Sequence, residues 1–318
     1  MSKVETDIEV MYRVAELYYE KSLTQQEIAD KLNYSRPMIS KLLSNANELG
    51  IVSITIQNPN SKAERLKKQI EKIFSSGDKQ LRVIVVPSST EDDLTRDRVY
   101  KAAANFLEAN ICDNQIIGIG RGSSVYGLVN KLSGNKHIGI ETVPLTGGLG
   151  SIDSYCQVNE TARKAASSLG GNCNYIYSPV YLGHMSTKEA ILTDPVLKPS
   201  FDLWDKLDWA IVGIGAIFQA NNTYYMDRIL KAELETGQKV TADLCVNLID
   251  SSGKAVDSKS NPVIAINLSQ LRKAKQVMAI APGTYKTQAI LGCLKGNWID
   301  ILVTDECTAI NLIKKSQH

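Results

Sequence analysis

The sequence has few of the residues that build metal centres, disulfide frameworks or membrane spans. Its 318 residues include three widely separated histidines and six cysteines without Cys-x-x-Cys spacing. The N-terminus carries no signal-peptide pattern, and together these features predict reduced thiols in a soluble cytoplasmic protein without metal or cofactor. No apolar run approaches the roughly twenty residues that span a bilayer, so we expect no membrane partner.

The chain also lacks a large excess of charge of either sign. The net charge is +2, and residues 1–58 hold six Lys or Arg against eight Asp or Glu, so overall charge gives no argument for nucleic-acid binding. Residues 31–47, however, contain three cations and no acid. The distribution of charge therefore favours one locally positive segment.

Residues 23–43 predict two short helices joined by a tight turn. Thr24 and Glu27 have the spacing of a capping box, Asn33 suits a left-handed turn, and Ser35 is a good cap for the second helix. Apolar residues recur at helical spacing in both helices. They are Ile28, Ala29 and Leu32 in the first helix, and Ile39, Leu42, Leu43 and Ala46 in the second.

The flanking sequence favours a winged helix–turn–helix that binds double-stranded operator DNA. An amphipathic helix over residues 8–18 precedes the motif, and residues 52–56 alternate as in a short strand. An ordinary helical hairpin is the alternative. Hydroxyls and cations on the outer face suit phosphates and base edges. The predicted DNA-binding residues are Thr24, Gln25, Tyr34, Ser35, Arg36, Ser40 and Lys41.

The remainder of the chain, after a break at residues 58–61, reads as one larger domain over 59–318. A basic amphipathic helix is expected over 62–74, and from residue 82 short apolar strands alternate with helices, which indicates a parallel sheet covered on both faces. The expected strands are 82–86, 116–119, 139–145, 174–177, 209–212, 263–265, 276–279 and 299–303, and the expected helices include 92–108, 159–169 and 285–294.

Glycine-rich loops follow several of these strands, where α/β sheets bind ligands. In residues 116–127 glycines let the backbone approach an anion, and Ser123 and Ser124 begin a helix, so a phosphate fits there. The spacing is not that of a dinucleotide fingerprint, and a tight turn without ligand is the alternative. Lys286 offers a point charge to a phosphate, and Asp243 offers an acceptor to sugar hydroxyls.

The chain resembles the SorC family of bacterial sugar-metabolism regulators from its N-terminal segment to its C-terminus. The matching segments are 15–56, including Leu17-Tyr-Tyr19, Thr24-Gln25, Ser35-Arg36-Pro37 and Ser40-Lys-Leu-Leu43, and then Asn159-Glu-Thr-Ala-Arg163, Ala210-Ile-Val-Gly-Ile-Gly215, Ala242-Asp243, Leu302-Val-Thr-Asp305 and Thr308-Ala309. The resemblance implies an α/β chain: an N-terminal winged helix–turn–helix over 1–58, then a larger Rossmann-like effector-binding domain similar to sugar-phosphate isomerases.

The resemblance also implies a phosphorylated sugar as effector and a homo-oligomer, a dimer or a tetramer. The expected effector-binding residues are Gly120, Arg121, Gly122, Ser123, Ser124, Thr146, Gly147, Gly148, Asp243, Gly283, Thr284 and Lys286. Two positions depart from the family pattern: Arg121 replaces an aromatic residue, and Pro282 interrupts a glycine pair. Arg121 either adds to anion binding or points to solvent.

The leading hypothesis is a DNA-binding transcriptional regulator of a sugar-utilisation operon, not an enzyme. One alternative is a sugar-phosphate isomerase-like enzyme with Asp243 or Glu160 as base and Lys286 holding the phosphate. Another is a regulator that senses a carboxylate such as citrate between Arg121 and Lys286.

Overall fold

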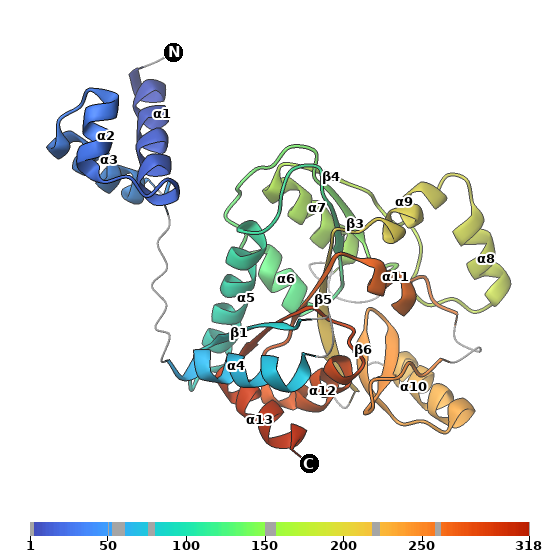
Figure 1. Ribbon diagram of the computed structural model, residues 1–318. Helices are drawn as coiled ribbons and strands as arrows, with labels where there is room; N and C mark the ends of the chain where they lie inside the picture. The colour runs from blue at the N-terminus through green and yellow to red at the C-terminus, as the bar shows by residue number, and fades with distance from the viewer. Residues whose placement is uncertain are drawn as a thin grey trace. The chain divides into compact units, whose positions relative to one another are not determined.

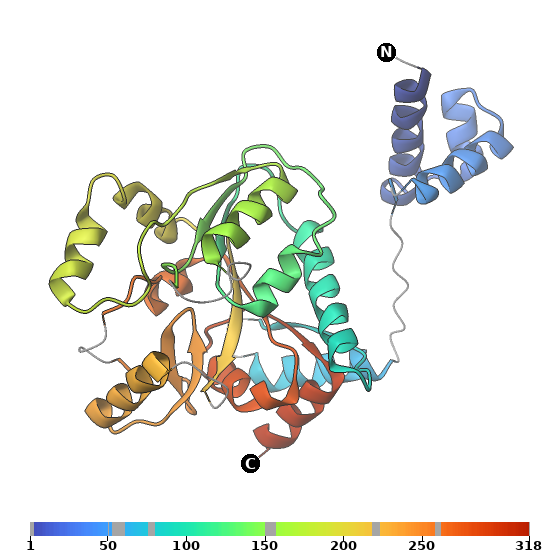
Figure 2. The ribbon, with the colours of Figure 1, turned by 180° about the vertical axis from the view of Figure 1, so that it is seen from behind.

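The computed structural model describes residues 3–49, 51–52, 61–75, 80–149, 157–217, 223–257 and 262–317. The chain forms two compact units, Met1–Asn58 and Pro59–His318, drawn in Figures 1 and 2. Within the described residues, no helix combines the length and the apolar character needed to cross a membrane.

The first unit is a small helical bundle. Its helices are α1 (Lys3–Ala15), which continues into a π-helical turn (Glu16–Glu20), α2 (Gln25–Leu32) and α3 (Arg36–Glu48). The predicted apolar stripe is confirmed: Ile28, Ile39 and Ala46 are buried, and they pack with Met11 and Val14 of α1. The expected strand over 52–56 lies, apart from Val52, outside the described residues.

The turn between α2 and α3 has the predicted local chemistry. Thr24 and Glu27 form the capping box, and Asn33 ends α2 with φ +56° and ψ +41°, in the left-handed region. The Ser35 hydroxyl accepts a hydrogen bond from the Met38 N–H at the start of α3. These local interactions determine where one helix stops and the next one starts.

The second unit is built on a nine-stranded sheet. Seven parallel strands lie in the order β1-β9-β8-β5-β2-β3-β4, and an antiparallel pair, β6 and β7, extends from the end of β5. The strands are β1 (Arg82–Val86), β2 (Ile116–Ile119), β3 (Glu141–Pro144), β4 (Asn172–Cys173), β5 (Trp209–Ala216), β6 (Val240–Leu244), β7 (Asn247–Asp250), β8 (Gln276–Ile280) and β9 (Ile301–Asp305).

Helices cover both faces of the parallel strands, as predicted. On one face lie α5 (Asp92–Glu108), α6 (Ser123–Val129) and α7 (Val158–Leu169); the other face packs against α4 (Lys62–Phe74), α11 (Leu268–Lys273), α12 (Thr287–Lys295) and α13 (Glu306–Ser316) (Figure 1). Alternate residues of β5 face the two layers: Ala210 and Val212 lie in one core, Trp209 and Ile211 in the other. The remaining elements are α8 (Met185–Thr193), α9 (Lys198–Asp202), α10 (Thr223–Thr236) and 3-10 turns at Leu203–Asp205 and Thr284–Lys286.

Several expected elements differ in the structure. The strand predicted over 174–177 is wrong, because β4 already ends at Cys173, and residues 263–265 form only isolated bridges, through Val263 and Ala265. A two-residue strand and single bridges form only where another segment of the same chain lies alongside. The pattern of apolar residues alone therefore does not locate them. The β6–β7 hairpin was not expected. Residues 285–294 begin with a 3-10 turn, and the α-helix starts at Thr287.

The left-handed Asn33 provides a test of the turn. We expect Asn33→Ala to lower the free energy of unfolding by about 1 kcal/mol, because a Cβ disfavours this conformation, whereas Asn33→Gly should be tolerated. Urea unfolding of the full chain, followed by circular dichroism, measures the difference. Equal stability of the alanine variant and the wild type would contradict this account of the turn.

Candidate ligand cavity and helix–turn–helix

A cavity of about 440 Å³ opens at the carboxyl ends of the central parallel strands. It lies where the strand order reverses between β2 and β5, the usual ligand position in such sheets. Eight of the twelve predicted effector-binding residues line it. They are Arg121, Gly122, Ser123, Ser124, Gly147, Gly148, Asp243 and Lys286.

The other four predicted residues are not among those that line the cavity. The Gly120 N–H donates to the Ile211 carbonyl, and a Cβ on Gly120 would lie 2.9 Å from that oxygen, so this glycine permits close strand packing. Thr146 is fully buried and bridges to Ala265. The Gly283 N–H donates to Asp305 at 2.8 Å, and Thr284 is exposed.

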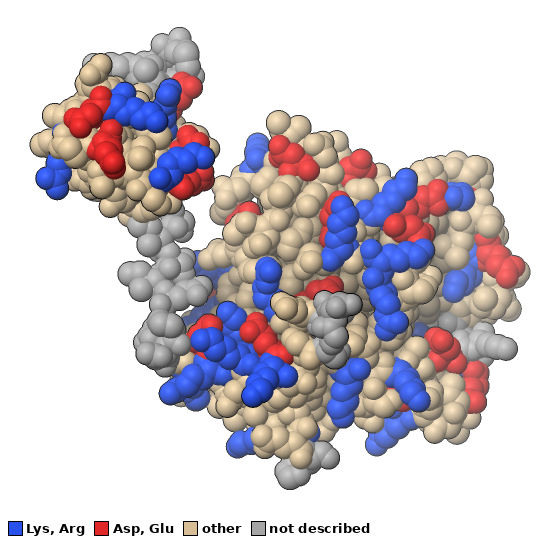
Figure 3. Space-filling view, in the orientation of Figure 1, with Lys and Arg blue, Asp and Glu red and all other residues tan. Residues whose placement is uncertain are grey.

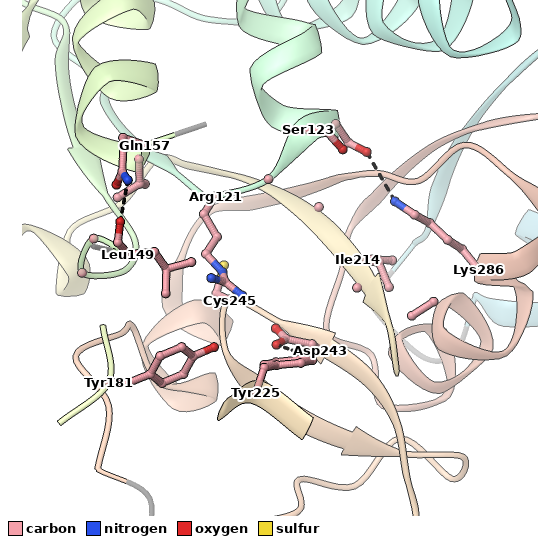
Figure 4. A pocket seen from close by; sticks show the side chains of 18 of the residues that line it. Arg121, Ser123, Leu149, Gln157, Tyr181, Ile214, Tyr225, Asp243, Cys245 and Lys286 are labelled. Atoms are coloured by element: carbon pink, nitrogen blue, oxygen red, sulfur yellow. Dashed lines mark hydrogen bonds between the residues drawn. The ribbon is translucent and has the colours of Figure 1, made fainter. Parts of the chain in front are cut away.

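One end of the cavity is formed by Lys286 and the start of α6. Lys286 is only 8% exposed, and its Nζ donates to the Ser124 hydroxyl at 3.4 Å (Figure 4). Gly122 caps α6 with φ +112°, a conformation that favours glycine and leaves the first N–H groups of the helix open to the cavity. This end presents one cation, hydroxyls and backbone donors.

The electrostatics of Lys286 are unusual for a buried cation. Burial, with a smaller contribution from the positive charge of Arg96, lowers the pKa of Lys286 to about 8. Among the described residues the structure records no carboxylate within salt-bridge distance of its Nζ. A buried ammonium normally requires a paired anion, so this end of the cavity is suited to receive one.

The opposite end is formed by the β6–β7 hairpin, α10 and Arg121. Asp243 of β6 is 7% exposed; its carboxylate accepts hydrogen bonds from the Tyr225 hydroxyl and the Val246 N–H, both at 2.7 Å. Figure 4 shows the Arg121 side chain extending across the cavity toward Cys245 and Asp243. Burial opposes the charge of Arg121, but its pKa is raised, chiefly by the Asp243 carboxylate. Arg121 therefore lies in the cavity and does not point to solvent.

Aromatic and polar residues that the sequence did not single out complete the walls. Burial raises the pKa of both the Tyr225 and the Tyr181 hydroxyls, and the negative charge of Asp243 adds to the shift in each. Both hydroxyls therefore stay protonated near neutral pH. Besides these two, the unpredicted lining residues include Leu149, Gln157, Cys245 and Tyr285. Leu149 and Tyr285 stand in the glycine-containing loops beside predicted residues, whereas the segments of Gln157, Tyr181 and Tyr225 carry no glycine-rich loop that would have identified them.

The geometry gives little support to a base at Asp243 or Glu160. Both carboxylate oxygens of Asp243 accept hydrogen bonds from the protein, and Glu160 pairs with Arg163 at 3.0 Å on the surface of α7, away from the cavity lining. Within the described part of the chain, no group of three or more His, Cys, Asp or Glu is placed to hold a metal ion.

In the first unit, the predicted DNA-binding residues lie around the turn and on the outer face of α3. Arg36, Ser40 and Lys41 are exposed along the N-terminal half of this helix, and Tyr34 is 40% exposed beside it. The Thr24 and Ser35 side chains are engaged in capping, and Gln25 is half-buried. The first half of α3 is thus presented as a recognition helix would be.

A helix–turn–helix joined to an α/β domain with a polar cavity defines a ligand-responsive transcriptional regulator. Residues 59–314 match the family model described as "Putative sugar-binding domain". The sorbitol operon regulator of Klebsiella pneumoniae is 31% identical over 317 residues, which cover 97% of this chain and 98% of that protein. The chain belongs to the SorC family of sugar-responsive transcriptional regulators.

Other comparisons agree with this assignment. The crystal structure of the full-length sorbitol operon regulator from Klebsiella pneumoniae superposes with a TM-score of 0.74 at 28% identity, covering 96% of this chain and 99% of that one. The deoxyribonucleoside regulator of Bacillus subtilis is 26% identical, covering 94% of this chain and 95% of that protein. The predicted fold class and the predicted regulator function are confirmed.

The buried ammonium gives a prediction about how the stability of the protein depends on pH. The shift of its pKa from 10.5 to about 8 corresponds to a destabilisation on the order of 3 kcal/mol at pH 7, which fades as pH rises from 8 toward 10.5 and the folded state loses its charge. Lys286→Met should therefore unfold at higher urea than the wild type at pH 7, and the difference should shrink by pH 10. A less stable variant at pH 7 would show that Lys286 has a partner.

Proposed function

We propose that the cavity binds a phosphorylated sugar and that this ligand controls binding of the helix–turn–helix to operator DNA. The observation that carries the proposal is the buried Lys286 beside Ser124 at the start of α6, without a recorded carboxylate partner among the described residues. A phosphate would accept hydrogen bonds from this cation, the hydroxyls and the free N–H groups of the helix. The sugar would then extend toward Asp243.

The charges that line the cavity favour a phosphosugar over citrate. Among the described residues, two cations, Arg121 and Lys286, and one acid, Asp243, line it, and Arg121 interacts electrostatically with Asp243. A ligand with one phosphate satisfies the free charge at Lys286. The carboxylates of citrate would in addition come close to Asp243, where like charges repel. The hydroxyls of a sugar at that end would have Asp243, Arg121, Tyr181 and Tyr225 as hydrogen-bond partners.

On the DNA side, the proposal assigns contacts to Arg36, Ser40 and Lys41 of α3, with Tyr34 and Ser35 supporting the entry of the helix. It is supported by their exposure on one face and by the family assignment. We further propose that the regulator acts in the cytoplasm as a homo-oligomer, a dimer or a tetramer, because paired half-sites require paired recognition helices. The effector would change their spacing if it binds one subunit arrangement more tightly than another.

A thermal-shift screen tests the ligand. Hexose and pentose phosphates, their unphosphorylated counterparts and citrate are compared; a ligand that binds only the folded state stabilises it by about 2.7 kcal/mol at 100 times its Kd. We expect a rise with a phosphosugar alone, lost in Lys286→Met and largely retained in Lys286→Arg. A response to citrate and not to any phosphosugar would overturn the assignment.

Substitutions in α3 test the DNA end. Arg36→Ala and Lys41→Ala should weaken operator binding, whereas Arg13→Ala, which removes an exposed cation from α1, should not. Loss of a base contact should relax specificity at one base pair by about 1–3 kcal/mol. Loss of a phosphate contact should lower the slope of log Kd against log salt concentration by about one. Fluorescence anisotropy at several salt concentrations separates these outcomes. Unchanged binding in both variants, or tight operator binding by a monomer, would contradict the proposal.

A further inference from the structure

Helix α4, the first element of the larger unit, has a cationic outer face. Arg65, Lys68 and Lys72 are exposed and recur at i, i+3 and i+7, so they share one side of the helix. On the opposite side Leu66 and Ile70 are buried in the sheet core, which fixes the orientation of the helix. The cationic face is therefore held outward by the packing.

The two acids of α4 do not neutralise this face. Glu64 lies 3.3 Å from Lys67, and the Glu71 carboxylate accepts the Val83 N–H of β1 at 2.8 Å, so it is turned inward. Within the part of the chain that the structure describes, no acidic partner is recorded for Arg65, Lys68 or Lys72. Figure 3 shows lysine and arginine side chains gathered, with some acids among them, where Figure 1 draws α4.

We propose that this face of α4 is a second DNA-contact surface, which binds phosphates of the duplex beside the site read by α3. The inference rests on the proposed DNA binding and adds to it a contact that is independent of base sequence. Arg and Lys on a single face provide the charge complementarity that phosphate contacts need. The surface would contribute affinity and leave base specificity to the recognition helix.

The dimensions of the helix fit a duplex backbone. Seven residues of α-helix span about 10.5 Å, and each DNA strand carries one phosphate per roughly 3.4 Å of helix axis. The face from Arg65 to Lys72 therefore has the length of about three phosphates of one strand. Three cations over this distance match that number.

The length of chain between the two units is compatible with a contact of α4 on flanking DNA. Nine residue steps separate Val52 of the first unit from Ser61, the cap of α4, and a fully extended chain spans at most about 3.3–3.6 Å per residue. This sets an upper limit of roughly 30 Å between the two points, close to one turn of the duplex. A second copy of the same face is a poor partner, because symmetric pairing would oppose like charges.

The test uses the full chain and mixed-sequence duplexes of 16 and 50 base pairs, which need no known operator. The triple variant Arg65→Gln, Lys68→Gln, Lys72→Gln keeps good helix formers and the buried face. On the 50-base-pair duplex its salt slope, log Kd against log salt, should fall by up to about 2.7 per bound subunit, about 0.9 for each lost phosphate contact. On the short duplex, which lacks flanks, the loss should be smaller.

A matched control removes the same charge elsewhere. Lys206, Lys231 and Lys239 are exposed outside α4, and their triple glutamine variant changes net charge equally. An equal fall in slope for both triple variants, or no fall for the α4 variant, would overturn the inference. The Arg36→Ala, Lys41→Ala double variant is measured alongside; if it alone loses binding, the proposed function stands and the α4 surface fails.

Discussion

The pairing of β5 with three other strands is the constraint on which the rest of the larger unit depends. Its first residues lie between β2 and β8 in parallel register, and its last three pair with β6 in the antiparallel sense. Because β5 runs past the end of the parallel sheet, it carries the β6–β7 hairpin over the carboxyl ends of the strands. Gly215 lies opposite Asp243 in this pairing, so the extension of one strand supplies the second wall of the cavity.

The two ends of the cavity differ in how well their charges are satisfied. Each carboxylate oxygen of Asp243 accepts a hydrogen bond, and its charge stabilises the cationic form of Arg121. Lys286 is buried, its Nζ donates to one hydroxyl among the described residues, and burial together with the positive charge of Arg96 lowers its pKa. A buried cation without a paired carboxylate costs stability, and an anion bound at Lys286, as proposed above, would recover that electrostatic energy.

The elements that the sequence predicted well are those set by local interactions. The start of α4 follows from its Ser61 cap, the course of α4 and α5 follows from helical periodicity, and the turn at Asn33 follows from its tolerance of the left-handed conformation. The β6–β7 hairpin escaped prediction because its turn residues, Cys245 and Val246, have φ of +51° and +69° without the usual glycine or asparagine. The Asn247 side chain donates to the carbonyls of Leu244, Cys245 and Ile266, which supports this turn through contacts that sequence pattern does not reveal.

The candidate site shows the same division. Glycine loops after parallel strands, together with Lys286 and Asp243, pointed to the carboxyl edge of the sheet, because the topology of α/β folds brings those loops together whatever the details of packing. Sequence alone thus determined the helix–turn–helix, the α/β character of the larger unit and the region of the cavity. Only the tertiary structure decided which loop residues face the cavity: Gly120 and Thr146 turn into strand packing, while Tyr181 and Tyr225 enter from distant segments. The direction of a side chain in a loop depends on long-range contacts, which a local pattern does not encode.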